Sequence, residues 1–396
     1  MHGVNLLPYG KIRKIECKEV DRSRTTMKVI CSKDNLLQGT QIAQRCVSPR
    51  APLPILNGIL LSASNNGLIF QATDLDLAIE CTLPAEVMTE GTVVVPARHF
   101  SDIVRRLPDQ NITLDYEPEH RLLTLTYGSA QFNIHTLNAE EFPLLPARPD
   151  TPTLEIDQIT FKDMIRQVAF AAATDPIRPI FTGVLLEIAP DYLMLVATDT
   201  HRLAKNKLVK PNTGFCEISR TIIPARALNE LNRLLKEEQS SLSIALSSSQ
   251  IVLYTEEFLF YSKPIKGIFP DHQKVIPPKI QTKLSVTIAD LLPAIERASL
   301  LISTKDGNSI VHLSIKQHCL TINSNSVNLG SVHEEIPVNV EGQELEISFN
   351  ARYLLDALKI INAEQISIEF AGHLSPCVIR PVSEEDYLYL LLPIRT

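Results

Sequence analysis

The residues best suited to chemistry stand together near the middle of the chain. Residues 197–202 read Ala-Thr-Asp-Thr-His-Arg, so only one residue separates Asp199 from His201. A carboxylate and an imidazole at this spacing could bind a metal ion or act as a catalytic pair. A metal site needs roughly three or four ligands. No second cluster of His and Asp stands nearby in the sequence, and His272 and His333 are isolated.

The same segment recurs elsewhere in the chain, which changes its interpretation. Residues 72–77 read Ala-Thr-Asp-Leu-Asp-Leu, and a faded copy at 323–326 reads Asn-Ser-Asn-Ser. The change from aspartate to Asn325 in the third copy suits a structural turn better than shared catalysis. The sequence also has no P-loop, G-x-S-x-G, H-E-x-x-H or G-x-G-x-x-G motif. We therefore predict a protein that is not an enzyme and has no metal and no cofactor, with an enzyme as an alternative.

A second marker follows each copy and fixes the period of the repeat. It reads Val-Pro-Ala-Arg at 95–98, Ile-Pro-Ala-Arg at 223–226 and Phe-Asn-Ala-Arg at 349–352. Successive copies of this marker lie 128 and 126 residues apart. Phe-Pro pairs at 142–143 and 269–270 close the first two copies. A period of this length is the size of a whole domain, so the chain contains three repeated domains.

The elements that position these markers follow one order in each repeat. A short strand leads into an amphipathic helix, several strands follow, and the second marker begins a second helix, predicted over residues 97–107, 225–235 and 351–361. Strands outnumber helices, and short turns such as Asn65-Asn66-Gly67 join many of them. This pattern predicts an α+β fold with two helices per repeat against antiparallel sheets. Three such units would form half of a ring, which a second copy could close.

The predicted domains span residues 27–147, 153–275 and 280–396, and proline-rich segments join them. Residues 1–26 lie outside the repeat and carry six Lys or Arg with little that could form a core. We interpret them as a disordered extension or as the product of an upstream translation start. The alternative is a basic arm that contacts nucleic acid or a membrane surface.

The composition limits the class of protein. Among 396 residues, 44% are hydrophobic, enough for ordinary cores, and no apolar run approaches the length of a membrane span. Seven scattered cysteines, an odd number, argue against a complete disulfide framework and indicate a cytoplasmic protein. The net charge of −7 excludes a general polycation. It allows a protein that is acidic outside and basic on one inner surface.

At this point the chain resembles the bacterial sliding clamp family, the β subunit of DNA polymerase III. The similarity covers Met27 to Thr396, and residues 1–26 have no counterpart in it. It rests on Pro-Arg-Ala-Pro-Leu-Pro-Ile-Leu at 49–56, residues 197–203, Glu-Phe-Pro at 141–143 and Leu-Pro-Ile-Arg at 392–395. The resemblance implies a DNA clamp fold in a head-to-tail homodimeric ring that encircles double-stranded DNA. Its implied partners are the replicative polymerase, the clamp loader and other proteins with a clamp-binding motif, and no membrane.

The resemblance also implies a partner-peptide pocket between the second and third domains. Carried over position by position, the pocket uses Arg178, Phe181, Thr198, Thr200, His201, Arg202, Leu203, Pro277, Leu390, Leu392, Pro393, Ile394 and Arg395. The apolar C-terminal residues are either a core strand or the lip of a groove. Family members often have Gly at the position of Thr200, so the rim of the pocket differs here.

Two further sets of residues follow from the family pattern. For contact with DNA, the best candidate is Arg50 in a loop, followed by the helical residues Arg98, Arg105, Arg106 and Arg166. Solvated helix faces of mixed charge are the alternative for these arginines. For the dimer contact we expect Phe132 and Ile134 to meet Leu301 and Ile302, although all four could be ordinary core residues. The alternative function is a protein-binding scaffold that does not encircle DNA.

Overall fold

The computed structural model describes residues 26–48, 52–209, 218–301, 309–326, 329–383 and 386–395. The chain divides into two compact units. The first extends to Asp150 and includes Glu257–Leu259, and the second comprises Thr151–Glu256 and Phe260–Thr396. The first unit therefore holds the first predicted repeat, and most of the other two repeats lie in the second unit. The predicted extension, apart from Thr26, lies outside the described residues.

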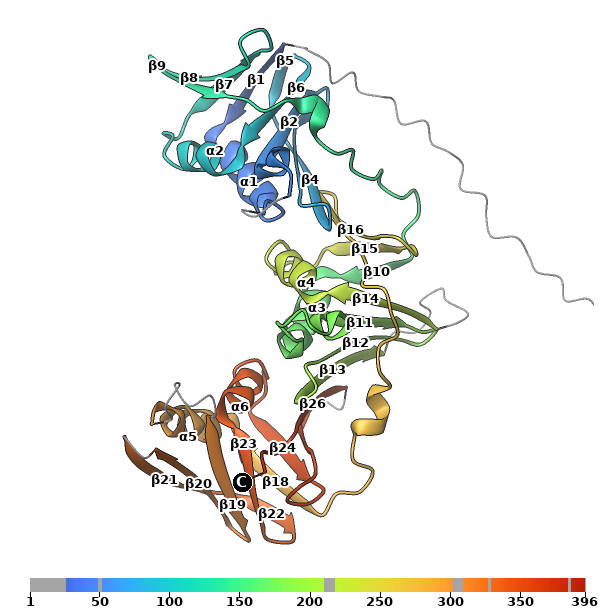
Figure 1. Cartoon of the computed structure of the whole chain (residues 1–396), viewed down its shortest axis with the longest axis vertical. Helices are drawn as coiled ribbons and strands as arrows, with labels where there is room; N and C mark the ends of the chain where they lie inside the picture. Colours follow the sequence, from blue (N-terminus) through green and yellow to red (C-terminus); the bar gives the residue numbers. More distant parts are fainter. Residues whose placement is uncertain are drawn as a thin grey trace, which may run out of the picture. The chain divides into compact units, whose positions relative to one another are not determined.

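The described residues of the first unit form the α-helices α1 and α2 and strands of two antiparallel sheets (Figure 1). One sheet has the strand order β5-β1-β7-β8-β9, and the other contains β4-β3-β2-β6. The helices α1 and α2 pack against each other, and α1 also contacts β3 and β4. The elements in chain order are β1 (Met27–Ser32), α1 (Lys33–Gln44), η1 (Pro54–Asn57), β2 (Gly58–Ser64), β3 (Gly67–Thr73), β4 (Leu77–Leu83), β5 (Glu86–Thr89), β6 (Gly91–Pro96), α2 (Ala97–Val104), β7 (Asn111–Glu117), β8 (Leu122–Tyr127), β9 (Ala130–His135) and η2 (Ala139–Glu141).

Local sequence explains several of these boundaries. Ser32 caps α1, because its hydroxyl accepts a hydrogen bond from the Asn35 amide at 3.2 Å. The predicted hairpin at Asn65-Asn66-Gly67 is present as the β2–β3 connection. Gly67 has a φ of 119°, and a Cβ there would lie 2.4 Å from the carbonyl oxygen of Leu83. Only glycine fits this turn without strain.

The described elements of the second repeat follow the same order. Its strands β14, β11, β12 and β13 form one antiparallel group, and β10, β15 and β16 form another. The helices α3 and α4 contact each other, and α3 packs on β12 and β13. The elements are β10 (Leu154–Asp157), α3 (Gln158–Val168), η3 (Ala169–Ala171), η4 (Pro179–Thr182), β11 (Gly183–Ile188), β12 (Tyr192–Thr198), β13 (Arg202–Val209), β14 (Ser219–Pro224), α4 (Ala225–Asn232), β15 (Ser241–Leu246), β16 (Ile251–Tyr254), β17 (Phe258–Ser262) and η5 (His272–Val275).

The described elements of the third repeat again follow this order. Its helices α5 and α6 are in contact, and its sheets have the orders β22-β18-β24-β25-β26 and β21-β20-β19-β23. The elements are β18 (Thr282–Thr287), α5 (Ile288–Leu300), β19 (Ile310–Lys316), β20 (Cys319–Ser326), β21 (Gly330–Pro337), β22 (Asn339–Gly342), β23 (Leu345–Asn350), α6 (Ala351–Leu358), β24 (Gln365–Phe370), β25 (Cys377–Pro381) and β26 (Tyr387–Leu391). The predicted α+β fold with repeated two-helix units is thus confirmed. The exact domain boundaries stay a prediction.

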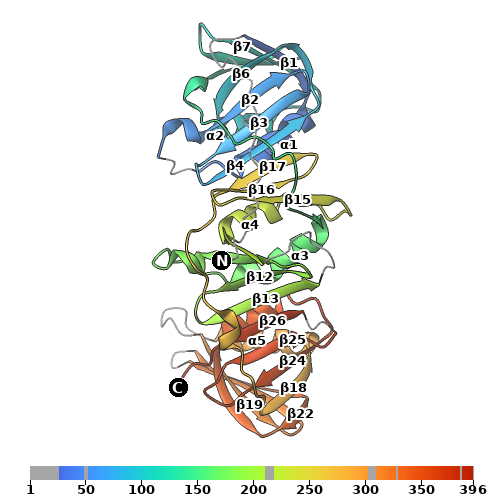
Figure 2. The same cartoon turned by 90° about the vertical axis from the view of Figure 1, so that its right-hand side faces the viewer.

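One strand pairing joins the second repeat to the third. The strand β13 pairs antiparallel with β26, with Arg202 opposite Leu391 and Ala204 opposite Tyr389. Figure 2 shows the strands of this continuous sheet side by side from β12 to β24. Its buried side chains include Leu185, Met194, Val196, Leu203, Ile222, Val378, Leu388 and Leu390. The C-terminal strand β26 is therefore a core strand, which was one of the two alternatives for the apolar C-terminal residues, and Leu392 lies beyond its end.

The second helix of each repeat is shorter than its periodicity predicts. The α2 helix ends at Val104, three residues before the predicted end. Beyond it, the amides of Arg106 and Leu107 bond to carbonyls three residues back, at 2.9 and 3.2 Å. The apolar period continues through this tightened turn, so the pattern extends further than the α-helix. Among the described residues, no helix is long and apolar enough to cross a membrane.

Candidate partner groove

The segment that could do chemistry forms a tight turn between β12 and β13. The Thr198 hydroxyl donates to the carbonyl of Arg202 at 2.6 Å and accepts from the Thr200 amide at 3.1 Å. The Asp199 carboxylate accepts from the amides of His201 and Arg202 at 2.9 and 3.0 Å. These bonds use the polar side chains to fold the backbone. The interpretation as a structural turn is therefore correct for this copy.

The first repeat forms the same turn from its own residues. The Thr73 hydroxyl bonds to the carbonyl of Leu77 at 2.8 Å and to the amide of Leu75 at 3.0 Å. Asp74 accepts from the amides of Asp76 and Leu77 at 3.1 and 2.8 Å. The central residue has a φ of 79° in both turns. In the third repeat, residues 323–326 lie within β20.

Arg202 ties the second turn to its surroundings. Its guanidinium donates to Asp199 at 2.9 Å, to Asp356 on α6 at 2.6 Å and to the carbonyl of Phe170 at 2.9 Å. It also lies 4.4 Å from the centre of the Tyr353 ring, in cation–π geometry. Arg202 is only 9% exposed. Although burial works to lower the pKa of Arg202, the hydrogen bond to Asp356 and nearby negative charges raise it, so the side chain stays charged.

Two adjoining cavities lie beside this turn and share Phe181, Thr200, His201 and Arg202. The apolar chamber has a volume of about 220 Å³ and is lined by Phe181, Thr198, Thr200, His201, Arg202, Leu203, Phe269, Pro270, Asp271, His272, Val275, Leu390 and Leu392. The polar chamber has a volume of about 800 Å³, and its lining includes Arg178, Asp175, Asp199, Asn350, Arg352 and Tyr353. An apolar chamber beside a polar one, formed by loops on a packed sheet, is suited to a short peptide.

The last residues of the chain form part of this groove. The Leu392 amide donates to the carbonyl of His201 at 3.0 Å, which holds the tail against the turn. The Leu392 side chain is 38% exposed and lines the apolar chamber. The Ile394 amide donates to the carbonyl of Ser348 at 2.8 Å, and Ile394 and Arg395 line a different cavity beside β19 and β23. The tail thus leaves the groove after Leu392.

Comparison with known proteins identifies the family. The models for the N-terminal, central and C-terminal domains of the DNA polymerase III beta subunit match residues 27–146, 155–271 and 273–395. The beta sliding clamp of Bacillus subtilis is 36% identical over 382 residues, covering 93% of this chain and all of that relative. The Staphylococcus epidermidis beta sliding clamp is 34% identical over 379 residues, with 93% of this chain and all of the relative covered.

The chain belongs to the DNA polymerase III beta subunit family.

Solved structures of beta subunits have the same fold. The crystal structure of the Bacillus subtilis sliding clamp superposes with a TM-score of 0.90 at 35% identity, covering 94% of this chain and all of that one. The Pseudomonas aeruginosa sliding clamp bound to griselimycin has a TM-score of 0.85 at 30% identity, with coverage of 93% and 100%. The resemblance found in the sequence is therefore confirmed over the region from Met27.

The structure brings together most of the residues that the family pattern suggested for the groove. Nine of them line one or both chambers, namely Arg178, Phe181, Thr198, Thr200, His201, Arg202, Leu203, Leu390 and Leu392. Pro277 and Pro393 line neither chamber, and Ile394 and Arg395 line the separate cavity. The role of all these residues in binding a partner stays a prediction.

Sequence reasoning missed the linker side of the groove and the start of α6. Phe269, Pro270, Asp271, His272 and Val275 close the apolar chamber, although the Phe-Pro pair had been noted only as a repeat marker. Asn350 and Tyr353 flank the third Ala-Arg marker. The repeat markers could have pointed to both parts of the groove, because the Phe-Pro pair and the Ala-Arg marker each stand where the chain enters or leaves a sheet.

The residues suggested for DNA and for the dimer have mixed positions. Arg98, Arg105, Arg106 and Arg166 are exposed on or at the ends of α2 and α3, and Arg50 lies outside the described residues. Phe132 is 40% exposed on β9, whereas Ile134 is buried within its own unit. Leu301 is half-buried at the end of α5, and Ile302 lies outside the described residues. In the described part of the chain, no group of three or more His, Cys, Asp or Glu could hold a metal ion.

Proposed function

We propose that this chain acts as a sliding clamp, a homodimeric ring that encloses duplex DNA in the cytoplasm. The ring holds the replicative polymerase and other DNA-processing proteins through the groove beside Arg202. The observation that carries this proposal is the match of all three repeats, in order and over nearly the whole chain, to the three domains of the beta subunit. Enclosure gives retention without tight binding, so a chain with a net charge of −7 can slide on a polyanion.

The pairing of β13 with β26 provides a template for closing the ring. The strand β13 comes third after the first helix of its repeat, and β26 comes third after the second helix. The equivalent strands without such a described partner in the chain are β21 in repeat three and β9 in repeat one, each at the edge of its sheet. Long exposed edges invite pairing with another chain. We infer that β21 of one copy pairs with β9 of the other.

The contacts at the β13–β26 joint support the residues proposed for the dimer. Phe170, just after α3, stacks on Tyr389 of β26 with ring centres 5.6 Å apart. The equivalent contact between copies would bring Phe132 of β9 to the end of α5, near Leu301 and Ile302. Phe132 already stacks on Tyr127 at 6.1 Å, which holds its ring in place at the edge. Leu300, which is 76% exposed at the end of α5, is a further apolar residue for this contact.

A repeated cation favours contact with DNA phosphates. Arg98, Arg226 and Arg352 occupy the same position in the first turn of the second helix of each repeat, and all three are exposed. A cation at the N-terminus of a helix opposes the helix dipole. Its presence in three repeats therefore argues for an anionic partner. Phosphate contacts of this kind are independent of sequence and weaken with salt, as sliding requires.

The groove fits a short peptide with apolar anchors. Leu203, Leu390 and Leu392 supply the apolar surface of the smaller chamber, and Tyr353 and Arg178 line the polar one. Peptides of this kind obtain most of their binding energy from a few side chains in well-packed pockets. The tether raises the local concentration of a polymerase at the primer end, as in any linked binding.

Primer extension tests this proposal. The cognate replicative polymerase copies a long primed circle in the presence of the clamp loader and ATP, with or without this chain. We expect product length to rise severalfold with the wild-type chain and to fall back with Phe132→Asp, which opposes ring closure. Leu144→Asp, at another exposed apolar position in the first unit, serves as the control. Unchanged product length with the wild-type chain would favour a protein-binding scaffold instead.

A further inference from the structure

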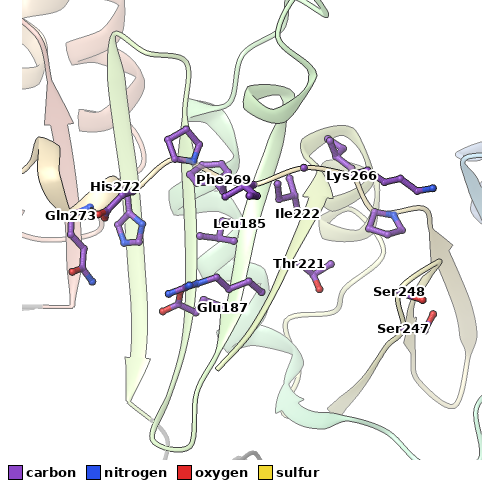
Figure 3. Close-up of a pocket in the computed structure, with 17 residues that line it drawn as sticks. Leu185, Glu187, Thr221, Ile222, Ser247, Ser248, Lys266, Phe269, His272 and Gln273 are labelled. Carbon is purple, nitrogen blue, oxygen red and sulfur yellow. Dashed lines mark hydrogen bonds and ion pairs between the residues drawn. The ribbon is translucent and has the colours of Figure 1, made fainter. Parts of the chain in front are cut away.

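A further large cavity lies along the linker that closes the apolar chamber. We name it the outer cavity. Its volume is about 910 Å³, and it lies between the linker at 264–273 and the strands β11 and β14, as Figure 3 shows. Leu185, Ile222 and Phe269 supply an apolar floor, and hydroxyls of Thr221, Ser247 and Ser248 lie around it. Neither the family match nor the groove accounts for this cavity.

The outer cavity and the apolar chamber share one wall. Phe269, Pro270, Asp271 and His272 line both of them. The apolar chamber, at about 220 Å³, is smaller than the roughly 300–1,000 Å³ of most ligand sites. The outer cavity offers a continuous second surface only four residues of linker away.

His272 is the chemical feature of this wall. Its side chain is 8% exposed, and its Nε2 atom has no hydrogen-bond partner among the residues that the structure describes. Figure 3 shows the imidazole pointing from the linker toward the sheet, on the same side as Glu187. Burial first, and then the charge of Lys205, lower the pKa of His272, so the ring is neutral at pH 7. A buried ring nitrogen without a partner is costly, which makes it an expected point of contact for a ligand.

The other buried polar group near the cavity is already satisfied. Glu187 is 2% exposed, and its carboxylate accepts from the Tyr192 hydroxyl and from Arg220, each at 2.5 Å. Burial works to raise the pKa of Glu187, but the hydrogen bonds from Tyr192 and Arg220 outweigh it and lower the pKa. Glu187 therefore stays charged and paired. His272 is left as the group that a ligand would complete.

The rim of the cavity presents one apolar side chain to solvent. Ile268 is 89% exposed. The linker is fixed on the near side by a 2.9 Å hydrogen bond from the Ile265 amide to Ile222. Gly267, with a φ of 141°, makes the sharp turn before Ile268, and a Cβ there would lie 2.8 Å from Ile180. A well-fixed linker that holds an isoleucine outward is suited to contact with a partner.

We propose that the replicative polymerase subunit that fills the apolar chamber continues across residues 269–272 into the outer cavity. Its flanking segment places an apolar side chain against Ile268 and a hydroxyl group on His272. A hydroxyl fits either tautomer of a neutral imidazole, because it can donate or accept. This inference rests on the proposed function of the groove. Continuity with the groove favours a flanking segment of the same partner over an unrelated ligand.

Two variants of the outer cavity test the proposal. Ile268→Asp places a charge at the rim, and Ser248→Trp fills the cavity from an exposed turn. Neither side chain supports the core, so both variants should fold. Binding is measured for the full-length cognate polymerase subunit and for its shortest fragment that still binds. We expect both variants to lower the affinity for the full subunit at least fivefold and to leave the affinity for the fragment within about twofold of the wild type.

Matched controls separate this inference from the function of the groove. Ser249→Trp adds the same ring at a neighbouring exposed serine outside the lining, and should bind the subunit like the wild type. Leu392→Ala, in the apolar chamber, should lower the affinity for the subunit and for the fragment by similar factors. If Leu392→Ala weakens both while Ile268→Asp and Ser248→Trp change neither, the outer cavity is not a docking surface. If Leu392→Ala changes neither, the groove proposal fails, and this inference fails with it.

Hydrogen exchange gives an independent readout that needs no variant. Amides at 264–273 should become at least threefold slower to exchange when the full subunit is bound than when the fragment is bound. Equal exchange in the two complexes would overturn the proposal.

Discussion

The Thr-Asp turns of the first and second repeats have nearly the same backbone conformation, but they have different surroundings. Thr73 and Thr198 make the same hydrogen bonds, and Leu75 and Thr200 share a φ of 79°. The residue that ends the turn, however, is Leu77 in the first copy and Arg202 in the second. The repeat thus conserves a shape, and a single position decides whether that shape anchors a neighbouring domain.

The segments around the second turn form a groove beside Arg202. Arg202 reaches Asp356 of the third repeat, Leu392 crosses the turn as the chain ends, and Phe269 closes the other side. These three contributions come from α6, the C-terminal tail and the linker. A repeat motif can therefore identify the scaffold of a site, whereas the site itself is made by segments that differ between repeats.

Replacing the anchor with its counterpart from the first turn should have the largest effect. Arg202→Leu leaves Asp199, Asp356 and the Phe170 carbonyl without their charged donor. Removal of one member of a buried ion pair costs about 3–5 kcal/mol. We expect a loss of this size in the unfolding of the second unit, measured by denaturant titration. Arg233→Leu, which breaks an exposed pair with Glu230, should cost at most about 1 kcal/mol. An equal loss in the two variants would contradict the anchoring role.

Shortening Leu392, the tail residue that contacts the second turn, should weaken partner binding with little change in the stability of the protein. Leu392→Ala should weaken the partner fragment about tenfold, a typical loss for an apolar anchor. Arg395→Ala should weaken it less, because Arg395 lines the neighbouring cavity. Fluorescence polarisation measures both, with Leu144→Ala as the control. Unchanged affinity in Leu392→Ala and Arg395→Ala would refute the assignment of the tail.

Relieving the backbone strain in both turns should give matched gains in stability. A β-branched or bulky residue at a positive φ is strained by about 1–3 kcal/mol, and glycine removes this strain at the expense of chain entropy. Leu75→Gly and Thr200→Gly should each stabilise their unit by about 1 kcal/mol. Thermal unfolding measures the gain in each unit.

Only one of these two glycines should affect binding. Thr200 lines both chambers of the groove, so Thr200→Gly should also alter the affinity for the partner fragment. Leu75→Gly should leave that affinity unchanged. If both glycines leave it unchanged, Thr200 does not shape the groove.

The smallest expected effect concerns the linkers that follow the two repeats. His272 follows the second Phe-Pro pair at the position that Leu145 occupies after the first. Burial and Lys205 lower the pKa of His272 in the folded state, and Arg220 opposes its protonation, while Glu187 and Asp271 favour it. The unfolded chain takes up the proton near pH 6.5. The stability of the second unit is therefore full above this pH and falls as the pH drops below it.

A melting-temperature series from pH 7.5 to pH 5 measures this effect. The wild type should lose more stability toward pH 5 than His272→Gln, which has no group to protonate. Parallel curves for the two proteins would show that His272 does not contribute to the pH dependence.

The repeats made the fold predictable from the sequence, because the copies of each marker support one another. The Asn65-Asn66-Gly67 hairpin and the helix starts at Ala97, Ala225 and Ala351 were all predicted correctly. The ends of the second helices were not, since apolar spacing continues through the tighter last turn. The pairing of β13 with β26 was also out of reach, because register between distant strands depends on packing that no local pattern encodes.

The groove was predictable only where the family pattern names its residues. Arg202 reads as one more surface cation, and nothing in its neighbours reveals the distant Asp356 that it binds. His272 reads as an isolated histidine, because its burial depends on the path of the linker across the sheet. Contacts between elements far apart in the chain decide both cases, and a single sequence does not contain them.

Retention on closed DNA tests the central claim most directly. The chain is loaded onto nicked circular DNA by its cognate clamp loader with ATP, and the bound fraction is measured by gel filtration before and after the circle is cut. A ring that holds DNA by enclosure stays on the circle and runs off the linear ends, and this is the result we predict. Equal retention on circular and linear DNA would contradict enclosure, because it would show that the chain grips DNA directly.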